Sequence, residues 1–411
     1  MNYKKSPFAS LRIRSFRFQW SADSMMTWGS EMETLILGWY ILVATDSPFL
    51  VGLLGALAFS GTLVAPIIGV IADRISRKIM LNVLRTCAGF LAFSLLILVV
   101  TDLIKPSYVF IIAGLTGLMR SSDNVLRQSL IADTVPSHLL MNASGLARTT
   151  QDLARIIGAL LGATLLSRLG LGWAYVGVTG FYAFSVLLGL GITSIRSNKP
   201  IHAVNPLGEL KQGVSYMMDS RVIQPIMFLA FLVNATAFPL SHGLMPIVAR
   251  DVYGRDENGL AQMVATFAVG ALIGSALMAS VIKSSRPERL MMLGMILWYL
   301  LLIVFSQMGL YGFGLVLLAL IGASISFCMI SMSVVLMTFT KFEMRGRVMG
   351  IRMLAVYGLP MGLVIGGWLI EHFGVSVMIT GYAIIGLISV ALSIVRWPEL
   401  ITGFHLKYKQ R

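Results

Sequence analysis

The ten residues Gly69-Val-Ile-Ala-Asp73-Arg74-Ile-Ser-Arg77-Lys78 join two apolar runs of the chain. They place one carboxylate and three cations where the chain leaves the first run, beside a glycine that lets helices approach closely. Such a carboxylate can dock on the N-terminal end of a neighbouring helix, where unpaired backbone N–H groups favour an anion. A loop that only kept positive charge on one side of a membrane would need the cations, but it would not need Asp73.

Long apolar runs continue from this loop through the whole chain. Of the 411 residues, 57% are hydrophobic and only 12% are charged, and the mean hydropathy is +0.83. A water-soluble chain carries about a quarter charged residues, so this composition excludes a soluble globular enzyme, a disordered chain and a peripheral protein. Because one bilayer span needs about 20 mostly apolar residues, we predict an all-α membrane protein. Its twelve transmembrane helices are expected at roughly 18–44, 48–72, 79–101, 107–131, 140–167, 171–195, 222–249, 258–282, 289–308, 311–339, 346–371 and 374–396.

A polar stretch from Arg196 to Arg221 separates the predicted helices into two groups of six. The stretch is too short for a nucleotide-binding domain, and the chain contains no glycine-rich phosphate loop followed by Lys and Ser or Thr. ATP is therefore not expected to drive the protein, and we predict no cofactor. The predicted organisation is an N-terminal six-helix bundle at 1–195, a cytoplasmic linker at 196–221, a C-terminal six-helix bundle at 222–396 and a cytoplasmic tail at 397–411.

Small residues recur in the two predicted halves at one constant offset in numbering. The offset aligns Gly158, Gly162, Leu165 and Gly170 with Gly362, Gly366, Leu369 and Gly374. Glycines spaced four apart let a neighbouring helix approach the backbone, so we assign the first two of each set to helix packing. Glycine is frequent in this chain, with 40 residues, so coincidence is the alternative. The shared order of the matches favours an internal repeat and two pseudo-symmetric bundles.

The distribution of positive charge predicts the orientation. Most of the 32 Lys and Arg residues, Arg85 among them, fall on the side of the predicted spans that both termini share. Positively charged loops resist translocation, so we predict a multi-pass protein of the cell (inner, cytoplasmic) membrane with both termini in the cytoplasm. The first apolar run contains Asp23, Glu31 and Glu33 and is too long for a secretory signal, so we interpret it as a retained span.

The remaining composition excludes several kinds of partner. The net charge of +14 follows from the positively charged loops, so the expected partner is the lipid bilayer and not nucleic acid. The two cysteines, Cys87 and Cys328, lie inside apolar runs, and the five histidines are scattered. We therefore predict no metal site and no disulfide framework.

The run from Gly69 to Lys78 closely resembles the G-x-x-x-D-R-x-x-R-K signature of the major facilitator superfamily. With the predicted spans, cytoplasmic ends and central linker, the resemblance covers nearly the whole chain. It implies the major facilitator fold, in which Asp73 docks on the N-terminal end of the eleventh helix and holds the cytoplasmic side shut. Gly69, Arg74, Arg77 and Lys78 complete this gating motif, and we expect a monomer. The equivalent loop of the second half, Lys283 to Arg289, keeps the charges but lacks the motif.

A second stretch is similar to the drug and siderophore exporter branch of that superfamily. It runs from Arg127-Gln128 through Asp133 and Asn142-Ala143 to Arg155-Ile-Ile-Gly158. The antiporter pattern G-P-x-x-G-G of the fifth helix is only partly present, because its proline and last glycine are missing after Gly158. The resemblance to this branch implies antiport, but the sequence contains only part of the antiporter signature.

The arginines of the fourth and fifth predicted helices allow two interpretations. They can bind an anionic substrate, or they can pair locally, since Asp123 with Arg127 and Arg148 with Asp152 are each four residues apart on one helix face. We keep Arg127, Gln128, Asp152 and Arg155 as substrate-binding or structural candidates.

The first predicted helix carries a polar stripe inside the membrane. At 100° per residue, one face gathers Asp23, Thr27, Ser30 and Thr34, and Glu31 and Glu33 flank it on opposite sides. An ionised carboxylate at mid-bilayer costs about 3 kcal/mol or more, so it normally faces a cavity or a partner. A carboxylate in a cavity of low polarity accepts a proton more readily than one in water, which makes these acids candidate proton carriers in a cavity wall.

An ion pair between helices is the alternative for these acids, with Arg120, Arg127 or Arg148 as the partner. For Asp23, near the cytoplasmic edge, the two interpretations stand equal. For Glu31 and Glu33 the cavity is favoured.

Together these features predict a carrier that works by alternating access, with its halves rocking about a central site. Its predicted task is export of a small amphipathic molecule, a siderophore or a drug, in exchange for protons. Uptake, or transport of a lipid-like substrate, is an alternative within the same fold. A membrane-embedded enzyme is the alternative from another class. No His-Glu-x-x-His, Gly-x-Ser-x-Gly or paired catalytic aspartate motif supports it, so we predict that the protein is not an enzyme.

Overall fold

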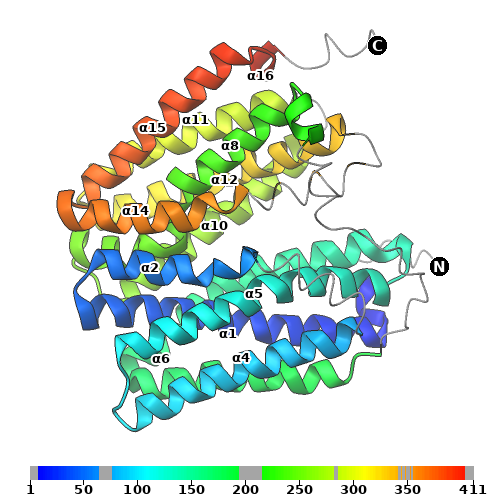
Figure 1. Ribbon diagram of the computed structural model, residues 1–411, viewed down its shortest axis with the longest axis vertical. Coiled ribbons are helices and arrows are strands. Elements are labelled where there is room, and N and C mark those ends of the chain that lie inside the picture. The colour runs from blue at the N-terminus through cyan, green and yellow to red at the C-terminus, as the bar shows by residue number, and fades with distance from the viewer. Residues whose placement is uncertain are drawn as a thin grey trace. The chain divides into compact units, whose positions relative to one another are not determined.

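The computed structural model describes residues 8–63, 76–193, 215–281, 286–340 and 355–402, together with positions 344, 348 and 352. Within those ranges the regular structure is helical and contains no strand (Figure 1). The prediction of an all-α membrane protein is therefore confirmed.

The helices of the first half follow the predicted spans closely. Short 3-10 turns lie beside them at η2 (Ala9–Arg12), η3 (Ser60–Leu63) and η4 (Ser137–Leu139). The predicted range 48–72 continues into residues outside the described ranges. The long helices are α1 (Arg14–Thr45), α2 (Pro48–Ala58), α4 (Arg77–Val100), α5 (Pro106–Thr134) and α6 (Leu140–Leu190).

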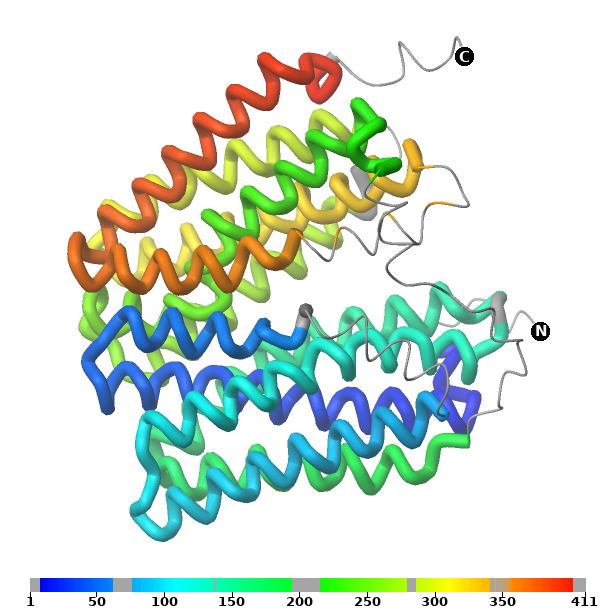
Figure 2. Tube along the Cα trace, in the orientation of Figure 1, coloured from blue at the N-terminus to red at the C-terminus, as the bar shows by residue number. Residues whose placement is uncertain are grey.

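The second half has a matching series of helices, traced in Figure 2. Its first span, Ile223–Val252, combines α8 (Ile223–Thr236), α9 (Met245–Ile247) and two π-helical turns, η5 (Leu240–Leu244) and η6 (Val248–Val252). Most of the first third of the predicted range 346–371 lies outside the described residues. The other helices are α10 (Glu257–Val281), α11 (Pro287–Ser306), α12 (Tyr311–Phe339), α14 (Gly358–Phe373), α15 (Val375–Arg396) and α16 (Glu399–Thr402).

Local sequence signals set several helix ends. Pro106 and Pro287 begin α5 and α11, at a position where the missing N–H of proline costs no helical hydrogen bond. Asp46 ends α1 in the left-handed conformation with φ 51°, which aspartate tolerates. Asp256 precedes α10, and the Gly259 N–H donates to its Oδ1 at 3.0 Å. This hydrogen bond is the main cause that lowers the pKa of the Asp256 carboxyl.

Two glycines that the sequence repeat aligns have the same unusual backbone. Gly170 interrupts α6 with φ 80° and ψ 177°, which divides it where two separate spans were predicted. Gly374 separates α14 from α15 with φ 84° and ψ 165°. This region of backbone conformation is essentially restricted to glycine. The agreement between the two positions supports the internal repeat.

The aligned packing glycines also occupy equivalent places. A side chain at Gly158 or Gly162 would meet α1, at Glu31 and Met32 respectively. A side chain at Gly362 would meet the carbonyl of Ala235, in the first span of the second half. In each half, therefore, the fifth span approaches the first span through glycine.

The helical contacts divide the chain into two compact units. The first contains Met1–Asp46 and Leu57–Val204, and the second contains Ser47–Ala56 and Asn205–Arg411. The start of α2 belongs to the second unit because its backbone packs on α14. There, the Ser47 Oγ and the Phe49 N–H both donate to Glu371 Oε2, at 2.7 and 3.0 Å.

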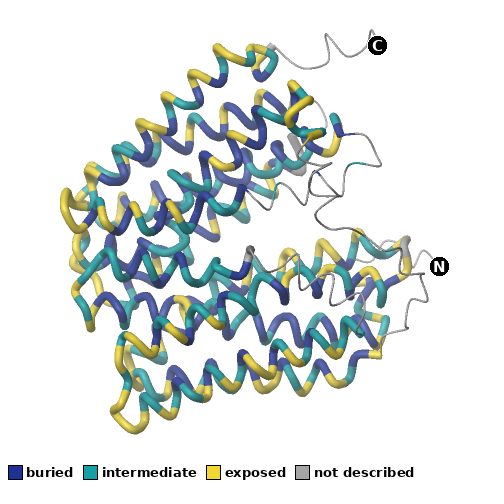
Figure 3. The backbone as a smooth tube through the Cα atoms, viewed as in Figure 1, coloured by how far each residue is buried: buried dark blue, intermediate teal, exposed yellow. Residues whose placement is uncertain are grey.

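Seven helices in the described ranges are long and apolar enough to cross a membrane. The long helices α1 and α5 are not among them, because their acidic and basic side chains lower their hydropathy. On α4 and α15, apolar residues such as Phe90, Val100, Leu392 and Val395 are exposed. Figure 3 marks the exposed positions along the backbone in yellow. A soluble protein has a polar surface and an apolar interior, whereas here the surface is apolar and charged side chains lie inside. This distribution is expected for a protein surrounded by lipid.

Candidate functional site

Four charged side chains form a buried network between α1, α4 and α5. Arg85 on α4 is fully buried and donates to Asp23 on α1 through Nη2 and to Asp123 on α5 through Nε, the latter at 2.8 Å. Arg127 Nη2 donates to Asp123 Oδ2 at 2.7 Å, and Arg127 Nε lies 3.8 Å from Asp23 Oδ1. Two carboxylates thus meet two guanidinium groups, and the network has no net formal charge.

This network decides between the two interpretations of Asp23. The side chain forms an ion pair between helices, with Arg85 as a partner that the sequence did not identify and Arg127 as one that it did. Counting Arg85 among the cytoplasmic cations was wrong, because it lies two helical turns inside α4 and is fully buried. The signal that could have found it is its depth in an apolar run, where an arginine needs a buried partner.

Glu31 lies between two arginines on a more open part of the same unit. Arg120 Nη2 on α5 donates to Glu31 Oε1 at 3.2 Å, and Arg155 Nε on α6 lies 3.9 Å from Glu31 Oε2. The Arg120 and Arg155 side chains are 31% and 36% exposed, and the Glu31 side chain is 16% exposed. This group is therefore reachable from outside the helix packing, whereas Arg85 is not.

The threonines of the predicted polar stripe accept hydrogen bonds from the same arginines. Arg127 Nη1 donates to Thr27 Oγ1 at 3.1 Å, and Arg120 Nη1 donates to Thr34 Oγ1 at 3.2 Å. One face of α1 is therefore joined to α5 by a row of polar contacts.

Glu33 points to the other flank of α1, toward α6. It is 6% exposed, and its Oε2 accepts a hydrogen bond from the Tyr182 hydroxyl at 2.7 Å. The described residues place no cation at ion-pair distance from this carboxylate. The hydroxyl of Tyr175, also on α6, is buried beside the same carboxylate. Glu31 and Glu33 therefore occupy different surroundings although two positions apart.

The two local ion pairs predicted on α5 and α6 are present. Asp123 pairs with Arg127 as described above, and Arg148 Nε lies 3.4 Å from Asp152 Oδ2. Arg148 is 75% exposed, so its pair is a surface contact of little strength. Gln128 is exposed on α5, and the site gains no contact from it in the described chain.

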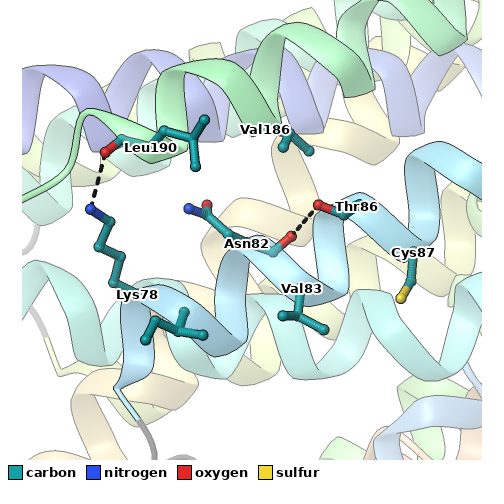
Figure 4. A pocket seen from close by; sticks show the side chains of 8 residues that line it. Lys78, Asn82, Val83, Thr86, Cys87, Val186 and Leu190 are labelled. Atoms are coloured by element: carbon teal, nitrogen blue, oxygen red, sulfur yellow. Dashed lines mark hydrogen bonds between the residues drawn. The ribbon is translucent and has the colours of Figure 1, made fainter.

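The gating motif is described only at its end. Arg77 Nη1 donates to both oxygens of Asp133 on α5, at 3.0 and 2.9 Å. Lys78 Nζ donates to the carbonyl of Leu190 at 3.0 Å, across a groove of about 350 Å³ between α4 and α6 (Figure 4). Gly69, Asp73 and Arg74 lie outside the described residues, so the docking of Asp73 stays a prediction.

The groove of Figure 4 is distinct from the charged site. Lys78 is its one charged lining residue, and Asn82 and Thr86 add polar groups to an otherwise mostly apolar wall. Among the described residues, no cluster of three or more His, Cys, Asp or Glu could hold a metal ion.

Comparison with known proteins identifies the family. The model of the Major Facilitator Superfamily matches residues 24–362 and, in a second match, residues 227–401. The chain belongs to this superfamily. It is therefore a multi-pass inner-membrane transporter of small molecules and not an enzyme.

Individual relatives of this superfamily member include exporters. The chain is 28% identical over 325 residues to the enterobactin exporter EntS of Shigella boydii serotype 4, across 76% of this chain and 74% of that protein. It is 27% identical, with the same coverage, to the enterobactin exporter EntS of Escherichia coli O139:H28. The resemblance to the exporter branch is thereby confirmed as a similarity of sequence.

Solved structures show the same fold. A bacterial homologue of the human lysosomal transporter Spinster matches with a TM-score of 0.76 and 12% identity, over 94% of this chain and 97% of that chain. A D-xylose–proton symporter matches with a TM-score of 0.72 and 12% identity, over 94% and 98%. At these identities the likeness establishes the major facilitator fold alone.

Proposed function

We propose that this superfamily member exports a small amphipathic molecule, a siderophore or a drug, in exchange for protons. Sequence similarity to proteins named as enterobactin exporters supports the direction and the substrate size. We further propose that both termini are cytoplasmic and that the protein works as a monomer. Its two rocking bodies would be the bundles at 1–195 and 222–396, joined by the linker at 196–221 and followed by the tail at 397–411.

The observation that carries proton coupling is Glu33, a buried carboxylate bonded to a hydroxyl. It accepts a hydrogen bond from the Tyr182 hydroxyl, which can donate to the ionised carboxylate or accept from the protonated one. Ionised, it is a buried charge with no cation at ion-pair distance among the described residues, so a change of surroundings shifts the balance between its two forms. A carrier that exposes Glu33 alternately to two aqueous compartments would therefore take up and release a proton.

The remaining acids take other roles in this proposal. Asp23 lies in the neutral buried network with Arg85 and Arg127, so it holds the first unit together. Glu31, on the open face, lies between Arg120 and Arg155, so the proposal assigns proton release to Glu33. Asp73 closes the cytoplasmic side, supported by Arg77, which is held by Asp133.

Inside-out membrane vesicles test the direction and the coupling. Acidifying the lumen should drive accumulation of a catecholate siderophore or an amphipathic dye, and a protonophore should abolish it. Vesicles without the protein are the control. No accumulation of any compound on acidification would count against export by proton exchange. Accumulation driven by an acidic exterior in right-side-out vesicles would support uptake instead.

The gate is tested by Asp73→Asn. We expect normal insertion and a strong loss of turnover, because an amide cannot supply the charge that a helix N-terminus favours. Asp102→Asn, in the loop between α4 and α5, is the matched control and should transport normally. Unchanged turnover in Asp73→Asn would remove the gating role.

A further inference from the structure

We propose that Arg120 and Arg155 bind an anionic group of the transported molecule, and that Glu31 occupies them when no substrate is bound. This inference depends on the proposed function at one point, because it assumes that the ligand is the transported molecule. It narrows the substrate class to amphipathic anions, such as carboxylates or ionised catechols. Glu31 then acts as a built-in anion that the substrate replaces.

The local charge balance is the first support. Two guanidinium groups, from α5 and α6, face one carboxylate from α1, at 3.2 and 3.9 Å. The group therefore has an excess of one positive charge when Glu31 is ionised, and of two when Glu31 is protonated. Guanidinium groups offer donors in a planar fork that matches a carboxylate, so an arriving anion would find suitable geometry.

Unused donors are the second support. The Arg155 contact at 3.9 Å is an ion pair but too long for a hydrogen bond, and Arg155 makes no hydrogen bond within the described part of the chain. About a third of its side chain is exposed, so a ligand can reach it. Arg85 differs, because it is buried and hydrogen-bonded to two aspartates.

Neighbouring charges do not remove this excess. On α5, Asp123 and Arg127 belong to the neutral buried network, and on α6, Arg148 pairs with Asp152. On α1 itself, Glu33 is turned toward the hydroxyls of α6 and lies beyond ion-pair distance of both arginines, although Arg120 is near enough to act on it electrostatically. The excess is thus confined to the surroundings of Glu31.

The arrangement fixes the sign of the pH effect on binding. A proton on Glu31 removes the internal competitor and frees both arginines, so a proton and an anion favour each other at this place. Exchange of substrate for protons requires the opposite relation. The exchange in the proposed function must therefore depend on another group, and Glu33 is the carboxylate that is free of arginine contacts.

Equilibrium binding to the purified full-length protein tests the inference without any gradient. The probes are dansylglycine, an amphipathic anion, and dansylglycinamide, its neutral analogue of nearly the same size. We expect dansylglycine to bind more tightly than the amide.

Variants separate this site from a merely structural role. Arg155→Gln and Arg120→Gln should weaken dansylglycine binding by on the order of tenfold, equivalent to about 1.4 kcal/mol, and leave the amide unaffected. Arg155→Lys keeps the charge and should restore most of the binding. Arg148→Gln makes the same charge change about two helical turns away on α6 and should have no effect.

Glu31→Gln gives the decisive result. Gln is neutral and cannot compete as an anion, so dansylglycine should bind more tightly to this variant than to the unmodified protein. Unchanged affinity in Glu31→Gln would overturn the inference, as would equal binding of both probes to the unmodified protein. Failure here leaves proton-driven export in vesicles intact, so the two proposals fail separately.

Discussion

The two units share a helical plan but differ in what they bury. The described interior of the first unit contains Asp23, Arg85, Asp123, Arg127 and Glu33. In the second unit, the described interior is aromatic, aliphatic and sulfur-containing, with hydroxyls and Glu288 as its buried polar side chains. A repeated fold has therefore concentrated its ionisable chemistry in one copy, and the second copy supplies apolar packing.

Trp298 illustrates the apolar packing of the second unit. It is fully buried in α11, with the ring of Phe238 5.0 Å away edge-on and the ring of Tyr299 stacked at 6.4 Å. The Tyr299 hydroxyl lies 2.8 Å from Thr236 Oγ1, so its polar end is satisfied. Such contacts hold helices together by shape and dispersion, in contrast to the ion pairs of the first unit.

The largest effect is expected for Arg85→Leu. Removing one member of a buried charge network leaves an uncompensated charge, here on Asp23 and Asp123, and costs about 3–5 kcal/mol. Unfolding in detergent micelles, followed by circular dichroism, would measure the loss. Asp23→Asn/Arg85→Leu removes one charge of each sign and should be more stable than Arg85→Leu alone. A double variant that is no better than the single one would contradict the charge-balance explanation.

An effect of opposite sign is expected in the second unit, for Glu288→Met. Glu288 is fully buried in the first turn of α11, and neither carboxylate oxygen has a hydrogen-bond partner in the described structure. Replacing it by an apolar side chain of similar length should raise the free energy of unfolding by about 1–3 kcal/mol. Unfolding in detergent micelles, followed by circular dichroism, would measure the gain. Destabilisation would mean that the second unit, too, depends on a buried charge.

A smaller effect is expected for Trp298→Phe. The Trp298 Nε1 is buried without a hydrogen-bond partner among the described residues, so losing this N–H removes no bond. An aromatic ring still fills most of the space, and the cost should stay below about 1.5 kcal/mol. A loss as large as that of Arg85→Leu would show that the second unit is equally intolerant of change.

The smallest effect is expected outside both interiors, for Asp256→Ala at the start of α10. Loss of a helix cap costs about 1 kcal/mol, and Asp256→Asn, which also caps, should cost less. Because the pKa of Asp256 is lowered in the folded protein, its contribution is present above the unfolded pKa and is lost as the pH falls through the folded pKa. The difference between Asp256 and Ala should therefore vanish in strong acid. A difference that persists there would contradict a charged cap.

Much of the fold could be predicted because apolar runs and polar breaks mark span ends directly. The division of α6 was predicted from the break between two apolar runs, and Gly170 lies at that break with a backbone that suits only glycine. The role of Arg85 could not be predicted, because assigning Lys and Arg to loops takes no account of the side chains that surround a residue inside the helix bundle. Its partners come from α1 and α5, and only tertiary packing brings them together.

The sequence identified most residues of the candidate site, but it did not identify which of them contact each other. Helical periodicity placed Glu31 and Glu33 on opposite flanks of one stripe, but it could not say which flank meets arginines and which meets tyrosines. That depends on how α1 is rotated against α5 and α6. The gating role of Asp73 stays a prediction, because that residue lies outside the described ranges.

The most direct test of proton coupling by the acids of α1 is transport by Glu31→Gln/Glu33→Gln in proteoliposomes. With the same substrate on both sides and no gradient, exchange of labelled substrate should continue, because binding and rocking do not require these carboxylates to titrate. An imposed pH gradient, however, should no longer drive accumulation, whereas the matched control Asp102→Asn should respond normally. Accumulation driven by pH at the unmodified rate in the double variant would contradict the account.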